Sequence, residues 1–173
     1  MGEGFNIKCT TCDYDFEILS GVGFAHSPNA VFYGRCDSNP ERRWSICFPD
    51  GICKPGTPLL LEIIESESIR ERALKLIADG AKPCDDYEYD LYLCPNCMNL
   101  ENLFYFKLLS LKEHYEPDYR CEKCQITLQR VKVVSYNERT LQLVYRNNHK
   151  ADWRCPKCGS NHLVHGGRFI NWD

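Results

Sequence analysis

Four Cys-x-x-Cys pairs constrain this chain more than any other feature of its sequence. They are Cys9/Cys12, Cys94/Cys97, Cys121/Cys124 and Cys155/Cys158. Two thiolates three residues apart on a tight turn can hold one tetrahedral metal ion from the same side, and a second pair completes a four-sulfur shell. Eight cysteines are enough for two such shells. We therefore expect the chain to be organised around two metal sites formed by these eight residues.

A metal-binding role is favoured over a redox or a disulfide role by the surroundings of the pairs. A redox Cys-x-x-Cys lies between a strand and a helix, whereas each pair here is followed by a predicted strand or turn. Disulfides are typical of exported proteins, but residues 1–8 lack the apolar core of a signal peptide. No apolar run is long enough to span a bilayer. We expect a cytoplasmic protein, outside the membrane, that keeps its thiols reduced.

The four pairs can be combined into two sites in three ways. We favour the third pair with the fourth, because the 30 residues between them are predicted to form a hairpin that brings the two ends together. The first pair then joins the second and closes a long insert, which is acceptable because loop-closure entropy grows slowly with length. A crossed pairing would knit the chain into one domain and stays open as an alternative.

Other candidate ligands are weaker. Four further cysteines have spacings that do not match a metal knuckle, and we interpret them as small buried apolar groups, with a third metal site as the alternative: Cys36, Cys47, Cys53 and Cys84. His162 and His165 follow the last pair and could replace a sulfur. Because four sulfurs are available for each site, we expect both histidines to be ordinary strand or surface residues.

The rest of the pattern predicts a β-rich protein with one helix. Apolar and acidic residues alternate after the first pair, between residues 13 and 18, as in a half-buried strand. Residues 126–136 and 140–145 are predicted to form a hairpin, and residues 26–58 a loop-rich insert. The helix is predicted over residues 66–79, with a capping box from Ser68 to Glu71 and an apolar stripe formed by Ile69, Ala73, Leu76 and Ile77. The segment 59–64 fits either a strand or a helical turn.

Charge divides the chain into two parts. Residues 1–116 carry 11 Lys and Arg against 19 Asp and Glu, and residues 117–173 carry 10 against 5. This asymmetry predicts a first unit over residues 1–116, which contains the long Cys-rich and helical insert, and a second unit over residues 117–173. The excess of basic residues in the second unit leaves contact with a nucleic acid open, although a basic excess of this size also arises on ordinary strand surfaces.

Basic and aromatic residues alternate in the second unit and are the candidates for such contact. Basic side chains could hold phosphates while aromatic rings stack on bases. The candidates are Arg130, Lys132, Arg139, Arg146, Lys150, Arg154 and Lys157, with Tyr136, Tyr145 and Trp153.

The cysteine knuckles resemble those of a known superfamily. Cys121-Glu-Lys-Cys124 and Cys155-Pro-Lys-Cys-Gly159 are similar to the paired knuckles of zinc ribbons, which occur in transcription factors, ribosomal proteins and rubredoxin-like proteins. The overall layout also resembles a group of uncharacterised bacterial proteins with two zinc-ribbon units. The resemblance implies a small α+β fold with two rubredoxin-knuckle-like units and one helix in the insert of the first.

The function indicated by these patterns is a zinc-binding structural or interaction protein without enzymatic activity. A closed four-sulfur shell has no open position for substrate. The sequence contains no His-Glu-x-x-His or Gly-x-Ser-x-Gly motif, no Walker loop and no zinc-deaminase motif. The acidic stretch 85–90 is interpreted as a solvated turn rather than a catalytic carboxylate pair. We expect two zinc ions per chain and a protein or nucleic-acid partner. An iron protein that transfers electrons, as rubredoxins do, is the alternative, because Cys-Pro-x-Cys occurs twice.

Overall fold

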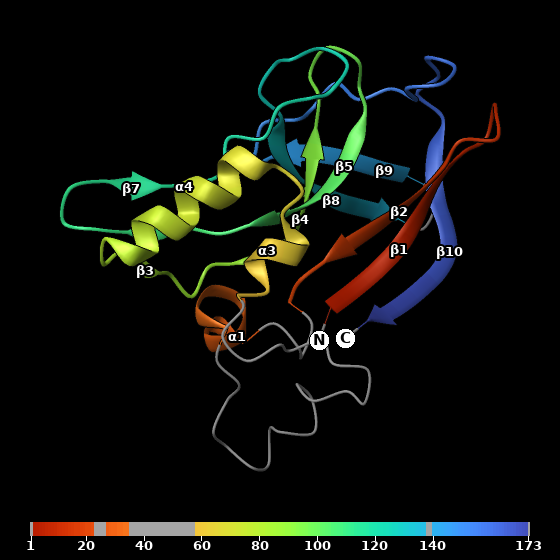
Figure 1. Cartoon of the computed structure of the whole chain (residues 1–173). Coiled ribbons are helices and arrows are strands. Elements are labelled where there is room, and N and C mark those ends of the chain that lie inside the picture. Colours follow the sequence, from red (N-terminus) through yellow and green to blue (C-terminus); the bar gives the residue numbers. More distant parts are fainter. Residues whose placement is uncertain (1, 23–26, 35–57, 138–139, 173) are drawn as a thin grey trace.

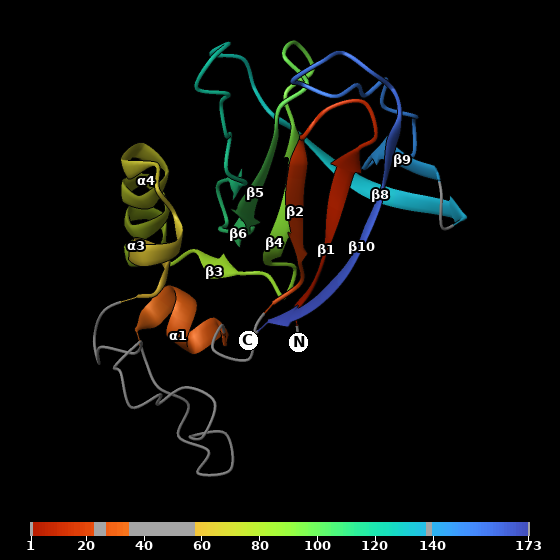
Figure 2. The ribbon, with the colours of Figure 1, turned by 90° about the vertical axis from the view of Figure 1, so that its right-hand side faces the viewer.

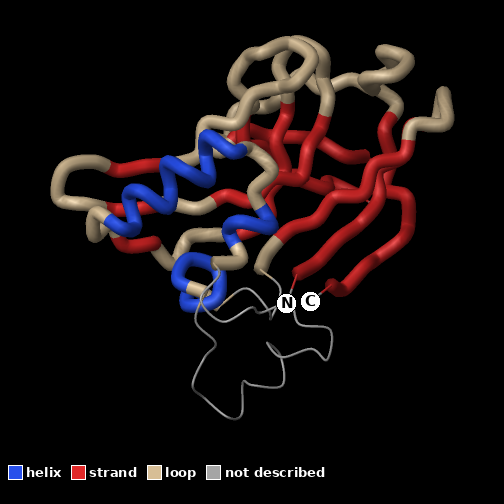
Figure 3. Tube along the Cα trace, in the orientation of Figure 1, coloured by secondary structure: helices blue, strands red, loops and turns tan. Residues whose placement is uncertain are grey.

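The computed structural model of the chain describes residues 2–22, 27–34, 58–137 and 140–172. Within these ranges the protein is a small, β-rich α+β structure with three antiparallel sheets and three helices. The helices lie together on one side of the molecule, and most of the strands lie on the other (Figure 3). No described helix is both long enough and apolar enough to cross a bilayer.

One of the sheets contains strands from both ends of the chain (Figure 1). The three-stranded sheet has the order β10-β1-β2, with β1 at Gly2–Cys9, β2 at Asp15–Ser20 and β10 at Leu163–Trp172. The four-stranded sheet has the order β5-β4-β8-β9, with β4 at Glu88–Leu93, β5 at Leu100–Tyr105, β8 at Gln129–Asn137 and β9 at Thr140–Tyr145. The third sheet joins β3 (Lys82–Pro83), β6 (Leu108–Leu109) and β7 (His114–Tyr115).

The first and last strands pair along almost their whole length. Gly2 lies opposite Trp172 and Cys9 lies opposite Leu163, with a bulge between Phe5 and Ile7. The two ends of the chain therefore lie side by side, as Figures 1 and 2 show. Because β10 belongs to the predicted second unit and β1 to the first, the sheets do not follow the boundary expected near Pro117. The division into units 1–116 and 117–173 stays a prediction.

The central strand β4 separates two hydrophobic cores. Successive side chains of a strand point to opposite faces, so Tyr92 packs into one core and Leu91 and Leu93 pack into the other. The helix-side core includes Phe32, Leu60, Ile64, Ala73, Leu76, Phe104 and Phe106. The sheet-side core includes Ile7, Ile18, Leu91, Leu93, Val131, Leu143, Trp153 and Leu163. All four side chains from Asp90 to Leu93 are buried, which is the burial expected of a strand covered on both faces.

The helical part agrees with the sequence in its main helix and differs at the N-cap of that helix. The main helix α4 spans Glu67–Ala78 and buries the predicted stripe of Ile69, Ala73 and Leu76, with Ile77 partly buried against the same core. Its N-cap is Ser66, without a side-chain hydrogen bond, so the predicted capping box at Ser68 is wrong. The segment 59–64, left open between strand and helix, contains the short helix α3 (Leu60–Ile63).

A third helix, α1 (Pro28–Tyr33), lies where only loops were expected. The hydroxyl of Ser27 accepts a hydrogen bond from the backbone N–H of Ala30, and Pro28 occupies the first turn. Gly34 ends the helix in the left-handed conformation. These are standard helix signals. The helix was not predicted because it is short and lies among residues that are also typical of turns. The expectation of a single helix is therefore wrong.

The position of β4 between two cores predicts the effect of truncating its side chains. We expect Leu91→Ala to lower the free energy of unfolding by about 2–5 kcal/mol, because Leu91 is 3% exposed and its removal leaves a cavity in the sheet-side core. Denaturant unfolding of the metal-loaded protein measures this loss. The matched variant is Leu111→Ala, which removes a fully exposed side chain and should change stability by less than about 0.5 kcal/mol. Equal effects of the two variants would contradict the two-core description.

Candidate metal centres

The eight cysteines of the four pairs form two compact groups. One group consists of Cys9, Cys12, Cys155 and Cys158, and the other of Cys94, Cys97, Cys121 and Cys124. Within each group the four sulfur atoms lie within 4.8 Å of one another. The Sγ–Sγ distance is 3.6 Å for Cys9–Cys158, for Cys12–Cys155 and for Cys97–Cys121. Four sulfurs at these separations fit around one tetrahedral metal ion, since metal–sulfur bonds are about 2.3 Å long.

The observed grouping corrects the pairing favoured from the sequence. The first pair joins the fourth, and the second joins the third, so the two sites are nested along the chain. Each group takes one pair from either side of the boundary expected near Pro117. The β8–β9 hairpin was predicted correctly, but it does not bring the third pair to the fourth. We call the group with Cys9 the outer centre and the group with Cys94 the inner centre.

All four knuckles share one backbone hydrogen bond. In each of them the N–H of the first cysteine donates to the carbonyl oxygen five residues later, at distances of 2.8–2.9 Å: Cys9 to Tyr14, Cys94 to Asn99, Cys121 to Ile126 and Cys155 to Ser160. This contact closes a tight loop around the two thiols. The repeated geometry follows from the local sequence and does not depend on which knuckle is the partner.

Three knuckles share a second contact that fixes the chain direction after the second cysteine. The N–H of the residue that follows the pair donates to the carbonyl of the first cysteine, from Met98, Gln125 and Gly159 at 3.0, 2.8 and 2.8 Å. These three residues have φ values of 61°, 59° and 74°. Only Gly159 adopts this left-handed conformation without steric cost. We infer that the tertiary structure holds Met98 and Gln125 in it.

Strand pairing explains why the first knuckle meets the last. Cys9 ends β1 directly opposite Leu163 near the start of β10, and the N–H of Thr10 donates to the carbonyl of His162 at 3.0 Å. The two knuckles lie at the same end of this strand pair, so their thiols converge. Thr11 and Ser160 add a hydroxyl contact of 3.0 Å between the two loops.

The inner centre is assembled by the β4–β5 connection and by Tyr119. The second knuckle is the turn between β4 and β5. The hydroxyl of Tyr119 donates to the carbonyl oxygen of Phe104 at 2.7 Å, and the carbonyl of Tyr119 accepts from Leu128 at 2.8 Å. These contacts hold the third knuckle beside the second. The amide of Asn96 donates to the Sγ of Cys124 at 3.2 Å and joins the two loops directly.

The pKa values of the outer thiols indicate that four thiolates in this group need a cation between them. Burial opposes ionisation of Cys9, but N–H groups of Thr11 and Cys12 outweigh it and lower the pKa of Cys9 from 9.0 to about 6. Burial and the neighbouring thiols raise the pKa of Cys12 to about 12. Thiolates packed together repel one another, so all four ionise together only around a cation, and metal binding releases their protons.

Each centre is attached to one core. Cys9 and Cys155 are buried in the sheet-side core, and Cys94 and Cys121 are buried in the helix-side core. The two centres are also linked, because the indole N–H of Trp153 donates to the carbonyl of Met98 at 3.1 Å. A metal ion at either centre therefore ties a knuckle pair to packed side chains rather than to a mobile surface loop.

The remaining candidate ligands lie outside the two groups. Cys36, Cys47 and Cys53 fall outside the described residues, and the alternative of a third metal site therefore falls outside them as well. Cys84 is partly buried and belongs to neither group. Both described groups consist of cysteines alone. The ring Nδ1 of His165 accepts a hydrogen bond from the N–H of Gly167 at 3.0 Å.

One buried charge was missed from the sequence. Asp90 belongs to the stretch interpreted as a solvated turn, yet its side chain is 9% exposed in β4. Arg130 donates to it at 2.6 Å, and Arg146 contacts both Asp90 and, at 3.1 Å, Glu88. The guanidinium of Arg130 also lies 3.2 Å from the ring centre of Tyr105. Asp85 and Asp86 are exposed, as expected.

This network changes the interpretation of the basic residues. Of the seven basic candidates for nucleic-acid contact, four form ion pairs with carboxylates of the protein: Arg130, Arg146, Arg154 and Lys157. Arg139 lies outside the described residues, and Lys132 and Lys150 are exposed. Trp153 is 8% exposed, so its ring is packed in the protein core. Four of the seven basic candidates are therefore engaged with carboxylates of the protein, and Trp153 offers no exposed ring for stacking on a base.

Comparison with known proteins returns no significant match to a protein-family model, to a curated protein or to a solved structure. The functional interpretation therefore depends on the geometry of the two centres and of the surfaces around them.

The nested pairing predicts a specific pattern of metal loss in cysteine variants. We expect Cys9→Ser and Cys155→Ser each to reduce the metal content from two ions per chain to one, and the double variant to retain that one, because both residues serve the same centre. Cys9→Ser combined with Cys94→Ser should lose both ions. Metal analysis of the purified variants measures this, with Cys84→Ser as the control that keeps two. Loss of both ions from the Cys9/Cys155 double variant would contradict the nested pairing.

The Asp90 network predicts a loss of stability when its carboxylate is neutralised. We expect Asp90→Asn to lower the free energy of unfolding by about 1–3 kcal/mol, because Arg130 is then left largely buried with only the more distant Glu88 as an acidic partner. The control is Asp152→Asn, which removes an 88% exposed carboxylate 3.7 Å from Arg154 and should cost less than about 0.5 kcal/mol. Denaturant unfolding at neutral pH compares the two, and an unchanged Asp90→Asn midpoint would show that the network is not stabilising.

Proposed function

We propose that this chain is a structural zinc protein that acts as a non-enzymatic scaffold for a protein partner. The observation that carries the proposal is the presence of two closed groups of four cysteines, each built into a hydrophobic core. Zinc binds four thiolates tetrahedrally without requiring a redox reaction. The shared knuckle geometry supports a likeness to zinc ribbons, with each ribbon-like unit drawn from two distant segments.

A structural role follows from the number of ligands. Four protein sulfurs complete the coordination shell, so no position remains for a water or a substrate. The buried members of each group contact core side chains, and metal binding therefore contributes directly to folding. A reducing compartment such as the cytoplasm is part of the proposal, because oxidised cysteine pairs could not ligate the metal.

A protein partner is proposed rather than a nucleic acid. Four of the seven basic candidates pair with carboxylates of the protein, namely Asp13, Glu88, Asp90 and Asp152. Positive charge that is neutralised within the protein does not release counterions from a nucleic acid, and that release is the main source of such affinity.

Electron transfer with iron remains the alternative for the same centres. Sulfur atoms of both accept backbone hydrogen bonds, from Thr11 to Cys9 at 3.4 Å and from Cys97 to Cys94 at 3.5 Å. Hydrogen bonds of this kind tune the potential of iron–sulfur sites, and Cys158 is exposed at the surface. Metal analysis of the purified protein distinguishes iron from zinc.

Metal analysis combined with chelation tests the proposed function. We expect the purified protein to be colourless with two zinc ions per chain, and to unfold when a strong chelator removes them, because each centre is part of a core. Circular dichroism and mass spectrometry under native conditions measure both properties, and added zinc should restore the fold.

Two results would contradict the proposal. A red protein whose visible absorption bleaches reversibly on reduction would establish the iron alternative. A metal-free protein with the same melting temperature would show that the cysteine groups are not structural metal sites. The Cys84→Ser variant again serves as the control, since it removes a thiol outside both groups.

A further inference from the structure

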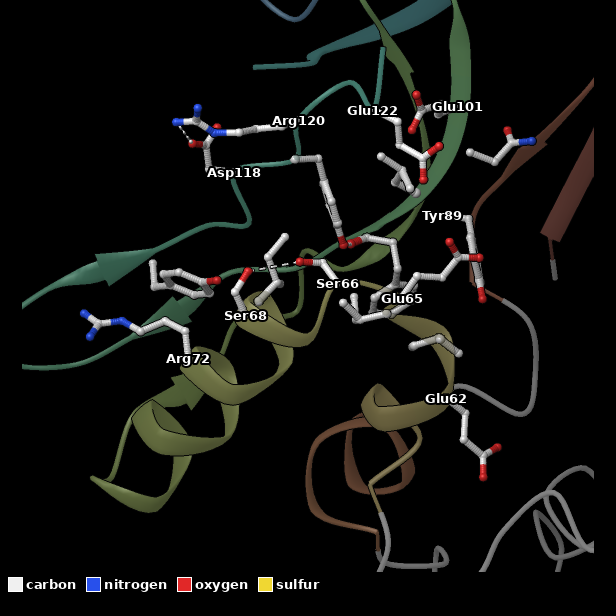
Figure 4. A pocket seen from close by; sticks show the side chains of 18 residues that line it. Glu62, Glu65, Ser66, Ser68, Arg72, Tyr89, Glu101, Asp118, Arg120 and Glu122 are labelled. Atoms are coloured by element: carbon white, nitrogen blue, oxygen red, sulfur yellow. Dashed lines mark hydrogen bonds and ion pairs between the residues drawn. The ribbon is translucent and has the colours of Figure 1, made fainter. Parts of the chain in front are cut away.

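A groove lies between the helices and the outer edge of β5. Its volume is about 980 Å³, and its walls come from the segment between α3 and α4, from β5 and from residues 118–120 and 122, on either side of Cys121 (Figure 4). None of the eight cysteines lines it. The scaffold function proposed above does not by itself explain this groove.

The groove runs along a strand edge. β5 is the terminal strand of the four-stranded sheet, and no described strand pairs with its outer side. Four consecutive residues, Glu101 to Phe104, line the groove. Because neighbouring side chains of a strand point to opposite faces, a cavity that meets all four lies beside the strand and not above one of its faces. Exposed strand edges are templates for the addition of another strand.

In the neighbouring sheet, a side chain of the protein itself covers the outer strand edge. The outer edge of β2 is capped by Asn102, whose side-chain oxygen accepts from the N–H of Leu19 at 3.0 Å and whose side-chain nitrogen donates to the carbonyl of Glu17 at 2.7 Å. On β5 itself, the hydroxyl of Tyr119 meets the carbonyl of Phe104 at one end. The stretch of β5 before that contact opens into the groove.

Apolar side chains form part of the groove's lining. Partly buried side chains of Ile63 and Leu103 contribute to it, together with the rings of Tyr89 and Tyr115. These side chains pack against the helix-side core from the outside. An occupant would therefore bury apolar side chains as well as form backbone hydrogen bonds, and the two together give strand-addition sites their affinity.

The rim of the groove is negatively charged. Its carboxylates are Glu62, Glu65, Glu101, Asp118 and Glu122, and Glu101 and Glu122 lie next to each other at the rim (Figure 4). Both arginines of the lining are occupied within the protein, Arg72 by Glu113 at 2.8 Å and Arg120 by Asp118 at 3.7 Å. Burial, with added repulsion from Glu122 and Glu65, raises the pKa of Glu101.

We propose that this groove binds an extended peptide segment of a partner protein, in which Lys or Arg alternates with apolar residues, as an additional strand on β5. The open edge requires an extended backbone, the apolar side chains of the lining accept those of the peptide, and the carboxylates pair with the basic ones. A nucleic acid is disfavoured, because its phosphates would be repelled by the same rim. The proposal rests on the scaffold function, for which it specifies the surface and the chemistry of the partner.

A synthetic peptide tests the proposal on the full metal-loaded chain. The probe is a fluorescein-labelled nonapeptide of alternating Lys and Val, and its binding is followed by fluorescence anisotropy. We expect saturable binding that weakens several-fold when salt is raised from about 50 mM to about 500 mM. Glu65→Gln combined with Glu101→Gln should weaken binding about fivefold. In NMR spectra, the amides of Glu101 to Leu103 should shift on binding.

Three controls make the result specific. The variant Glu67→Gln with Glu71→Gln removes the same charge from exposed positions of α4 that do not line the groove, and should bind as the unmodified protein does. A peptide with Glu in place of Lys should not bind. A Lys–Val peptide methylated at alternate backbone nitrogens should bind more weakly, because methylation removes strand hydrogen bonds.

Several outcomes would overturn the proposal. These are no binding at millimolar peptide, equal weakening by the two double variants, shifts confined to residues far from β5, or displacement of the peptide by an RNA oligonucleotide. If the protein holds two structural zinc ions but binds no peptide, the proposal of peptide binding in the groove is refuted and the proposed zinc function stands. Iron in the cysteine centres would refute the zinc function independently of peptide binding.

Discussion

Each four-sulfur centre joins two separate knuckles of the chain, and the rest of the structure depends on this closure. The outer centre ties Cys9 and Cys12 near one end of the chain to Cys155 and Cys158 near the other. The inner centre closes within the loop that the outer one defines. In a chain of 173 residues, metal ligation at these centres would supply folding free energy that small cores lack.

The centres and the cores reinforce each other through β4. This strand is buried on both faces, and Cys94 directly after it places the inner centre at the end of the helix-side core. The sheet-side core ends in the same way at Cys9 and Cys155. Trp153 then links the two centres through the carbonyl of Met98. This frame positions the open edge of β5, where we propose that a partner binds.

Local patterns predicted the elements well where a single periodicity dominated. The alternation after Cys12 produces β2, with Ile18 buried and Glu17 exposed, and the apolar stripe produces α4. The eight cysteines were identified as two groups of four, because knuckle spacing is a local property. The short helix α1 was missed since its Ser27 and Pro28 signals lie among turn residues of similar type.

The pairing of the knuckles could not be obtained from loop lengths. The 23 residues between the second and third pairs and the 30 between the third and fourth differ in closure entropy by only about 0.2 kcal/mol. Pairing between β1 and β10 determines that the first knuckle meets the last, and this pairing involves residues more than 150 positions apart. The burial of Asp90 was missed for the same reason, because its partners Arg130 and Arg146 reach it only when β8 and β9 join the sheet.

The sequence by itself determined the local chemistry of this protein: tight Cys-x-x-Cys turns, each closed by its own backbone hydrogen bonds, and strands and a helix with one apolar face. Such features depend on residues within a few positions of one another. The tertiary structure alone decided which knuckles lie together, which carboxylate is buried and which strand edge is left open. These outcomes depend on contacts between distant segments, and their small differences in chain entropy are outweighed by the packing of the two cores.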